Sequence, residues 1–204
     1  MILIACEFSG VVRDAFIKHG YDAISCDLLP TQSKGPHIQG NVIDIINNDW
    51  DMIIAHPPCT YLANSGVSHL KNNGLIDRNR WIKMTNATNF FKRILNNKCK
   101  YICIENPILH HYAIDKIGHK YDQIIHPWMF GHMEQKSTCL WLKNLPKLVE
   151  TNNVKTEMMK LPIKERQKMH WLPPSPNRGY LRSITYSGIA EAMATQWIPI
   201  LKNI

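Results

Sequence analysis

The chain has 204 residues, 45% of them hydrophobic, which is enough for a packed core in one domain with at most a small appendage. No apolar stretch approaches the roughly 20 residues of a membrane helix, and the amino terminus lacks a basic leader and a cleavage site. We therefore expect a soluble, cytoplasmic protein with no membrane partner. The formal charge of +8 favours a polyanionic partner such as nucleic acid over a merely basic surface.

Short apolar runs alternate with a helical pattern in the first part of the chain. Residues 2–6 predict a strand that enters the core, and residues 11–19 predict a helix. A second strand is expected at 23–26, followed by a loop rich in Pro, Gly and Ser at 28–40. Residues 52–55 form a clearer strand, because the prolines that follow cannot donate to a sheet.

The remainder continues the alternation less regularly. Residues 64–79 are polar and predict a mobile loop, and residues 80–95 have helical spacing. Ser187 is expected to cap the closing helix. The other expected elements are a strand at 101–104, a helix at 109–117, strands at 123–125 and 138–142, and the closing helix at 187–201. Strands that alternate with helices predict an α/β fold of the Rossmann type.

Reactive side chains follow two of the predicted strands. Pro58-Cys59 comes after the run at 52–55, and Glu105-Asn106 comes after the run at 101–104. In an open parallel sheet, chemistry gathers outside the carboxyl ends of the strands, and neighbouring strands lie only about 4.8 Å apart. Cys59 alone is compatible with an inert cysteine in a turn, and Glu105 alone with a helix-binding carboxylate. Together they predict an active site with a thiol nucleophile and a carboxyl acid.

The charge is concentrated in one proline-rich segment, residues 143–181. This segment has eight Lys and Arg against three Glu, and therefore five of the eight net charges. Trp171 and Tyr180 in or near its end are expected to fill the core rather than to stack on bases. The six cysteines are scattered and lack zinc-finger spacing, so neither disulfides nor a metal site is expected.

The ordered motifs resemble those of the cytosine-C5 DNA methyltransferases, and the chain looks like a short, phage-type member of that family. The motifs are Ala5–Gly10, Pro58-Cys59, Glu105-Asn106, Arg182–Thr185 and Gly188–Ala194. The resemblance implies a Rossmann-like class I S-adenosylmethionine-dependent methyltransferase fold with a minimal target-recognition insertion. The expected divisions are a catalytic core at 1–142, a recognition segment at 143–181, and a terminal helix at 182–204 that completes the cofactor pocket.

The resemblance also implies the chemistry. Cys59 would add to C6 of cytosine, so that C5 can take the methyl group of S-adenosylmethionine. Glu105, kept protonated by burial, would act as a general acid at N3. The expected contacts to the substrate come from Pro58, Asn106, Lys136 and Arg182.

The expected cofactor contacts come from Phe8, Ser9, Gly10 and Pro58, from Asp27 at the ribose, and from Asp44 at the adenine amine. Each aspartate alone is also compatible with a turn or cap role.

Some positions depart from the family pattern. Cys6 replaces a common aspartate, Val12 a glycine, Thr60 a glutamine and Pro107 a valine. The family's Gln-X-Arg-X-Arg element is only echoed by the segment 135–138, which contains Lys136.

The expected partner is DNA, either a duplex with a flipped cytosine or a single strand, bound by a monomer in a bacterial or phage-infected cell. A recognition segment of 39 residues predicts few base contacts, with phosphates supplying most of the affinity. The same chemistry on RNA or on a free cytosine nucleotide remains an alternative. So does a catalytically silent relative that binds nucleic acid or a protein. A dinucleotide enzyme is disfavoured, because no Gly-X-Gly-X-X-Gly follows the first strand.

Overall fold

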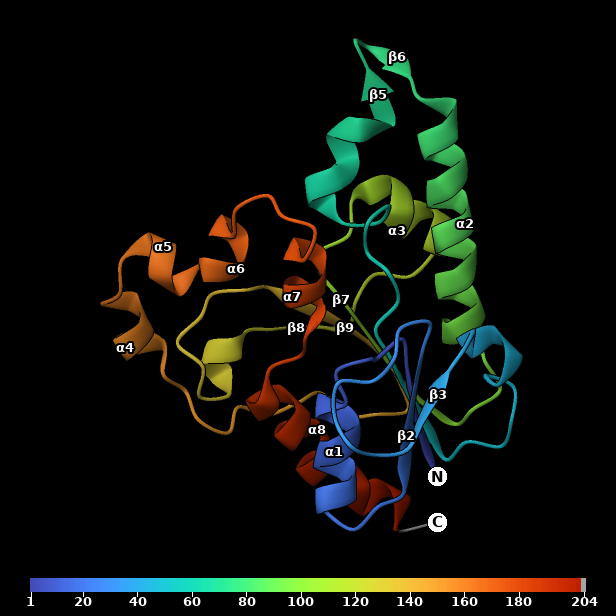
Figure 1. Ribbon diagram of the computed structural model, residues 1–204, viewed down its shortest axis with the longest axis vertical. Helices are drawn as coiled ribbons and strands as arrows, with labels where there is room; N and C mark the ends of the chain where they lie inside the picture. The colour runs from blue at the N-terminus through green and yellow to red at the C-terminus, as the bar shows by residue number, and fades with distance from the viewer. Residues whose placement is uncertain (203–204) are drawn as a thin grey trace.

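A computed structural model describes residues 1–202, and in that part of the chain the core is a seven-stranded sheet (Figure 1). The strand order is β3-β2-β1-β4-β7-β9-β8, and β9 runs in the direction opposite to the other six strands. The strands are β1 (Ile2–Ala5), β2 (Ala23–Asp27), β3 (His37–Gln39), β4 (Met52–Ala55), β7 (Tyr101–Asn106), β8 (Gln123–Ile125) and β9 (Thr138–Lys143).

Two pairs of helices cover the sheet. Helices α1 (Val11–Lys18) and α8 (Ser187–Leu201) lie side by side on one face, and α2 (Arg78–Leu95) and α3 (His111–Ile117) pack together on the other (Figure 1). Alternate residues of β1 serve the two layers: Ile2 and Ile4 join the cluster with α1 and α8, and Leu3 and Ala5 join the other. Every residue of β1 is therefore buried, as expected for a central strand of an α/β sheet.

This arrangement is a Rossmann-like α/β fold, as the sequence predicted. The chain builds β1, β2 and β3 outward in one direction and then returns to place β4 and β7 on the other side of β1. That reversal leaves a crevice outside the carboxyl ends of β1 and β4, where such sheets bind ligands. The closing helix has the predicted bounds, but Ser187 is its first helical residue. Tyr186 holds the cap position with an extended backbone, and no side chain caps the helix.

Two predicted loops contain regular structure. The segment 28–40 includes β3, and the segment 64–79 folds into the 3-10 helix η2 (Asn64–Leu70) and a hairpin of β5 (Lys71–Asn72) and β6 (Leu75–Ile76). The hairpin turn consists of Asn73 and Gly74, both with positive φ, which is the preferred chemistry of a two-residue turn. The hairpin projects beyond the start of α2 (Figure 1).

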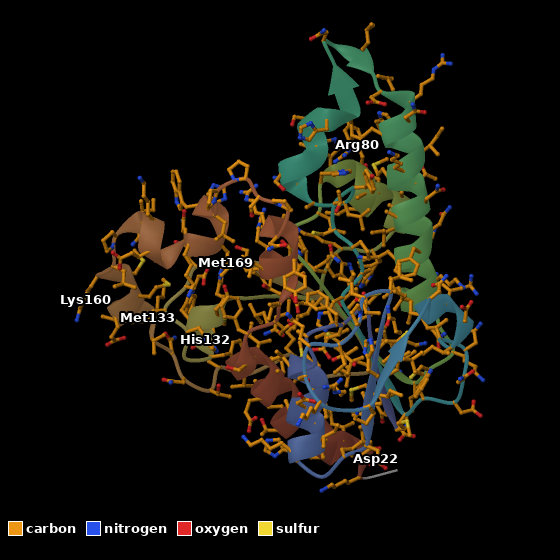
Figure 2. The ribbon with its side chains drawn as sticks, in the orientation of Figure 1. Asp22, Arg80, His132, Met133, Lys160 and Met169 are labelled. Atoms are coloured by element: carbon orange, nitrogen blue, oxygen red, sulfur yellow. The ribbon has the colours of Figure 1, made fainter. Side chains whose placement is uncertain are left out.

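The basic segment forms a lobe of short helices at one side of the molecule (Figure 1). It contains α4 (Lys155–Met159), α5 (Ile163–Arg166), α6 (Lys168–Trp171) and α7 (Arg178–Ser183). Trp171 is 51% exposed, so it does not fill the core as predicted, because α6 is a single turn at the surface. Lys160 and Met169 lie in this lobe (Figure 2). None of the helices in residues 1–202 is both long and apolar enough to cross a bilayer.

Candidate active site

The carboxyl ends of β1, β4 and β7 are aligned at one edge of the sheet. Ala55 at the end of β4 lies opposite Ala5 of β1 and Ile104 of β7. The next residue of β7 is Glu105, which remains in the ladder opposite Leu140 of β9. Glu105 is thus held by strand pairing with β9 on one side of its backbone, and its carboxylate contacts His56, the residue that follows β4.

The Glu105 carboxylate has two side-chain partners. His56, which directly follows β4, has Nδ1 3.0 Å from Glu105 Oε2, and Thr185 Oγ1 donates to the same oxygen at 3.2 Å. Burial alone would raise the pKa of Glu105, but the hydrogen bond and charge of His56, the charge of Lys136 and the Thr185 hydroxyl together lower it. Burial acts in the direction predicted for Glu105, but the histidine and the lysine that face the carboxyl outweigh it and lower the pKa.

Cys59 lies in a tight turn after Pro57 and Pro58. Its carbonyl oxygen accepts hydrogen bonds from the N–H groups of Leu62 and Ala63, at 2.9 and 2.8 Å. The side chain is half-buried, and burial raises the pKa of the thiol above its ordinary value. The charges of Arg182 and Lys136 act in the opposite direction, and Glu105 is close enough to raise the pKa further. The structure thus brings Cys59, Glu105, Lys136 and Arg182 together.

Two residues fix the Cys59 turn from opposite sides. Asn106 is buried, and its Nδ2 donates to the carbonyl of Pro57 at 2.8 Å. Arg80 of α2, which is labelled in Figure 2, donates to the carbonyl of Thr60 at 2.9 Å and lies 4.5 Å from the ring centre of Tyr61. Asn106 therefore has a structural role at this site. Arg80 was missed because nothing in the helical pattern of α2 marks it as different from its exposed neighbours.

The basic lobe continues directly into this corner. Lys136 Nζ donates to the carbonyl of Arg182 in α7 at 2.9 Å and lies 5.4 Å from the ring centre of Tyr186. Both predicted anchoring residues are therefore present at the site, and each contacts the other. Within residues 1–202 no group of three or more His, Cys, Asp or Glu is arranged to hold a metal ion.

A cavity of about 410 Å³ opens beside the Cys59 turn, outside β1 and β2. Of the predicted residues, Asp27 and Pro58 line it. Asp27 ends β2, and its Oδ1 accepts a hydrogen bond from the N–H of Leu29 at 2.9 Å. The complete lining is Cys6, Cys26, Asp27, Leu28, Gly40, Asn41, Val42, Pro58, Tyr61, Lys83, Asn86, Ala87 and Phe90.

Asp44 does not line this cavity. It is exposed in the 3-10 helix η1 (Val42–Asp44), and Asn41, which caps that helix, lines the cavity instead. Asn41 Oδ1 accepts a hydrogen bond from the N–H of Ile43 at 3.1 Å. The Gly40-Asn41 pair directly after β3 could have indicated a cavity residue at a strand end. It was missed because β3 was predicted to be part of a loop.

Phe8, Ser9 and Gly10 also lie outside the cavity lining. The Phe8 ring stacks on Tyr180 of α7, with ring centres 4.4 Å apart and planes 18° apart. Ser9 Oγ donates to Glu7 Oε1 at 3.3 Å. Gly10 has φ of +76°, and a Cβ there would collide with the Ser33 side chain, so both backbone shape and space require glycine.

One buried arginine fastens the loop after β2 to helix α1. Arg13 of α1 is fully buried, and its guanidinium reaches across to the loop that follows β2. It donates to Ser25 Oγ at 3.0 Å, Thr31 Oγ1 at 3.3 Å, the Pro36 carbonyl at 3.3 Å and the Ser33 carbonyl at 3.4 Å. The segment 28–40, predicted as an unstructured loop, is therefore fastened to the start of α1.

No family model and no curated protein matches the chain. Among solved structures, it is similar to an E. coli prophage protein named "putative DNA modification methyltransferase". The two share 16% sequence identity, with a TM-score of 0.45, over 79% of this chain and 55% of that one. The chain therefore spans little more than half the length of that protein. A likeness this distant carries no functional argument, so the assignment depends on the geometry of the site.

Proposed function

We propose that this protein transfers a methyl group from S-adenosylmethionine to C5 of cytosine in DNA, through a covalent Cys59 adduct. One observation carries the proposal. A half-buried thiol and a buried carboxylate share a corner with two cationic side chains at the ends of β4 and β7, next to a nucleoside-sized cavity outside β1 and β2. A nucleophile and an acid that flank one small ring are what addition to a cytosine requires.

The cavity suits the cofactor in size and lining. Its volume of about 410 Å³ is in the lower part of the usual range for ligand sites, roughly 300–1,000 Å³. Val42 and Phe90 supply apolar surfaces for an adenine, Asn41 supplies a polar edge, and the Asp27 carboxylate is available to ribose hydroxyls. When bound, S-adenosylmethionine supplies an electrophilic methyl group on a sulfonium.

In the proposed reaction Cys59 gives its proton to water, and its Sγ forms a bond to C6 of cytosine. Lys136 and Arg182 favour the thiolate by their charge and thereby oppose the larger effect of burial, which raises the pKa of the thiol. The electrons displaced from the C5–C6 double bond allow C5 to take the methyl group, while N3 takes a proton from Glu105. Loss of the C5 proton to a base then expels Cys59, and N3 returns its proton.

Duplex DNA is the proposed substrate because the basic lobe is joined to the site. Lys155, Lys160, Lys164 and Lys168 are exposed on the lobe, whose last helix, α7, contacts Lys136. Such charges bind phosphates without reading sequence. A small lobe that adjoins the reactive corner suits a short or relaxed target sequence.

The experiment is mass spectrometry of nucleosides after incubation with S-adenosylmethionine. Duplex DNA, single-stranded DNA, RNA and dCMP are compared, with Cys59→Ala as the matched control. We expect 5-methylcytosine in duplex DNA with the wild-type protein and none with the variant. Methylation of RNA or dCMP alone would move the proposal to that substrate. DNA binding without methylation of any substrate would identify a catalytically silent relative.

A further inference from the structure

His56 stands at the centre of a row of ionisable groups, although the mechanism above gives it no role. It directly follows β4, which lies between β1 and β7, so it is flanked by the ends of both strands. Its N–H donates to the carbonyl of Ala5 at 2.9 Å, which fixes its backbone. Its Nδ1 is 3.0 Å from Glu105 Oε2.

The surroundings of His56 isolate it from solvent. The side chain is 11% exposed, and Nε2 is buried without a hydrogen-bond partner among the described residues. The charged groups that face it are Glu7 after β1, Glu105 on β7 and Lys136 before β9. A buried ring with one nitrogen bonded and the other free of any partner exchanges protons mainly through the bonded side.

Glu7 is a fixed part of this row. It is buried, and its two carboxyl oxygens accept the N–H groups of Val12 and Arg13 at the start of α1, at 2.7 and 3.2 Å. Burial disfavours the charged imidazole, but the hydrogen bond to Glu105 and the charges of Glu105 and Glu7 outweigh burial and raise the pKa of His56. The two carboxylates therefore favour the protonated imidazole, and His56 in turn lowers the pKa of Glu105.

We propose that His56 is a positioning residue that orients the Glu105 carboxylate through Nδ1–H and lends it the proton that Glu105 gives to N3 of cytosine. The proposal rests on the function proposed above. It also explains how a carboxyl whose pKa is lowered by its partners acts as an acid. Sequence reasoning missed His56 because it read His-Pro-Pro only as the end of a strand.

The proton inventory balances without another reactant. As the Cys59–C6 bond forms, the proton on Nδ1 of His56 moves to Glu105, and Glu105 passes a proton to N3. This leaves a neutral imidazole beside an ionised carboxylate. When Cys59 is expelled, the N3 proton returns to Glu105 and then to His56. The pair ends each turnover as it began, and no net proton is consumed by it.

The first test needs no turnover. The ring signals of the ten histidines are followed by NMR against pH, with the His56 signal assigned by its loss in His56→Asn. We expect the His56 midpoint to fall by about one pH unit or more in Glu105→Gln, as for removal of a close opposite charge. His110, buried and bonded to the Tyr61 carbonyl at 3.1 Å, is the internal control and keeps its midpoint. An unchanged His56 midpoint overturns the proposal.

The second test separates proton lending from packing. Asn at position 56 can donate from about the position of Nδ1 but cannot titrate, whereas Ala can do neither. We expect His56→Ala to reduce kcat by about 100-fold or more, and His56→Asn to restore activity at low pH only. In His56→Asn the alkaline limb of the pH profile moves to lower pH, toward the titration of Glu105 itself. If the pH profile of His56→Asn had the same shape as that of the wild type, with only a lower activity at every pH, proton lending would be overturned.

The two proposals fail in different ways. A wild-type protein that methylates no cytosine substrate overturns the proton-lending role together with the proposed function, even if the NMR coupling is found. A wild-type protein that methylates DNA, with an unchanged pH profile in His56→Asn, overturns only the role of His56. The full proposal is supported if the His56 midpoint falls in Glu105→Gln and the alkaline limb of the activity profile moves to lower pH in His56→Asn.

Discussion

The two halves of the sheet's carboxyl edge are built on different principles. Outside β1 and β2 lies a cavity of about 410 Å³ with mostly apolar walls, where Asp27 is the one carboxylate among the lining residues. Outside β4 and β7 lies a closed corner in which Glu105 is bonded to both His56 and Thr185. The first region is a mostly apolar cavity, and the second is a cluster of hydrogen-bonded polar and charged side chains. A change in one half should therefore leave the other intact.

The largest expected effect is the loss of turnover in Cys59→Ala. Removal of the thiol leaves nothing to add to C6, so 5-methylcytosine should fall below detection while S-adenosylmethionine binding, measured by calorimetry, stays within about twofold. Cys99→Ala is the control, since Cys99 is buried near the start of β7 and far along the strand from Glu105. Substantial methylation by Cys59→Ala would contradict covalent catalysis.

Glu105→Gln should affect both turnover and the pH dependence of stability. We expect kcat to fall by about 100- to 10,000-fold, the usual contribution of a general acid. The raised pKa of His56 contributes stability below its unfolded value of about 6.5 that is lost as pH rises through the folded value. The lowered pKa of Glu105 contributes stability above its unfolded value of about 4.3 that is lost as pH falls through the folded value.

The advantage of the wild type over Glu105→Gln should thus be greatest between about pH 4.3 and 6.5 and shrink on either side. Urea unfolding at a series of pH values measures it. Parallel stability curves for the two proteins would show that His56 and Glu105 do not titrate as a pair.

Asp27→Asn should weaken cofactor binding without changing the reactive corner. Loss of a charged acceptor for ribose hydroxyls typically costs about 1.5–3 kcal/mol, so the Kd for S-adenosylmethionine should rise by about 10- to 100-fold. Asp44→Asn is the matched control, because Asp44 is exposed and outside the cavity. Equal effects of the two variants, measured by calorimetry, would contradict the assignment of the cavity to the cofactor.

The smallest expected effect is in the basic lobe. Lys160→Gln should weaken DNA binding by only a few-fold and reduce the slope of log K against log salt by about one. Lys98→Gln is the control: Lys98 pairs with Asp49 near the amino-terminal end of β7, on the edge opposite the site. An unchanged salt slope in Lys160→Gln would place the DNA elsewhere.

The sequence predicted an element correctly where the pattern of consecutive residues alone determines it. The fully apolar run of β4 and the bounds of α8 were both predicted, because burial on a sheet and helical spacing are written in consecutive residues. β3 was missed because it has three residues, none of them buried, and follows Gly35-Pro36. Its hydrogen bonds to β2 are a property of the sheet, not of its own composition.

The site divides in the same way. Cys59 and Glu105 were predicted as a pair because strand ends that share an edge must be near each other. The partners of Glu105 were not predicted, since His56 follows the neighbouring strand β4 and Thr185 is 80 residues away. The contact of Phe8 was missed for the same reason, because the ring on which it stacks, Tyr180, comes from a segment distant in sequence. Contacts of this kind depend on packing between elements, which no local pattern records.

Arg13 joins the loop after β2 and the first turn of α1 into a single cooperative unit. A guanidinium that is fully buried cannot lose some acceptors and keep others at little cost, because each vacated donor would remain without water. We therefore expect amide exchange in segment 28–40 to occur by one concerted opening that also releases the start of α1. Ligand in the cavity would then slow exchange well beyond the residues it touches.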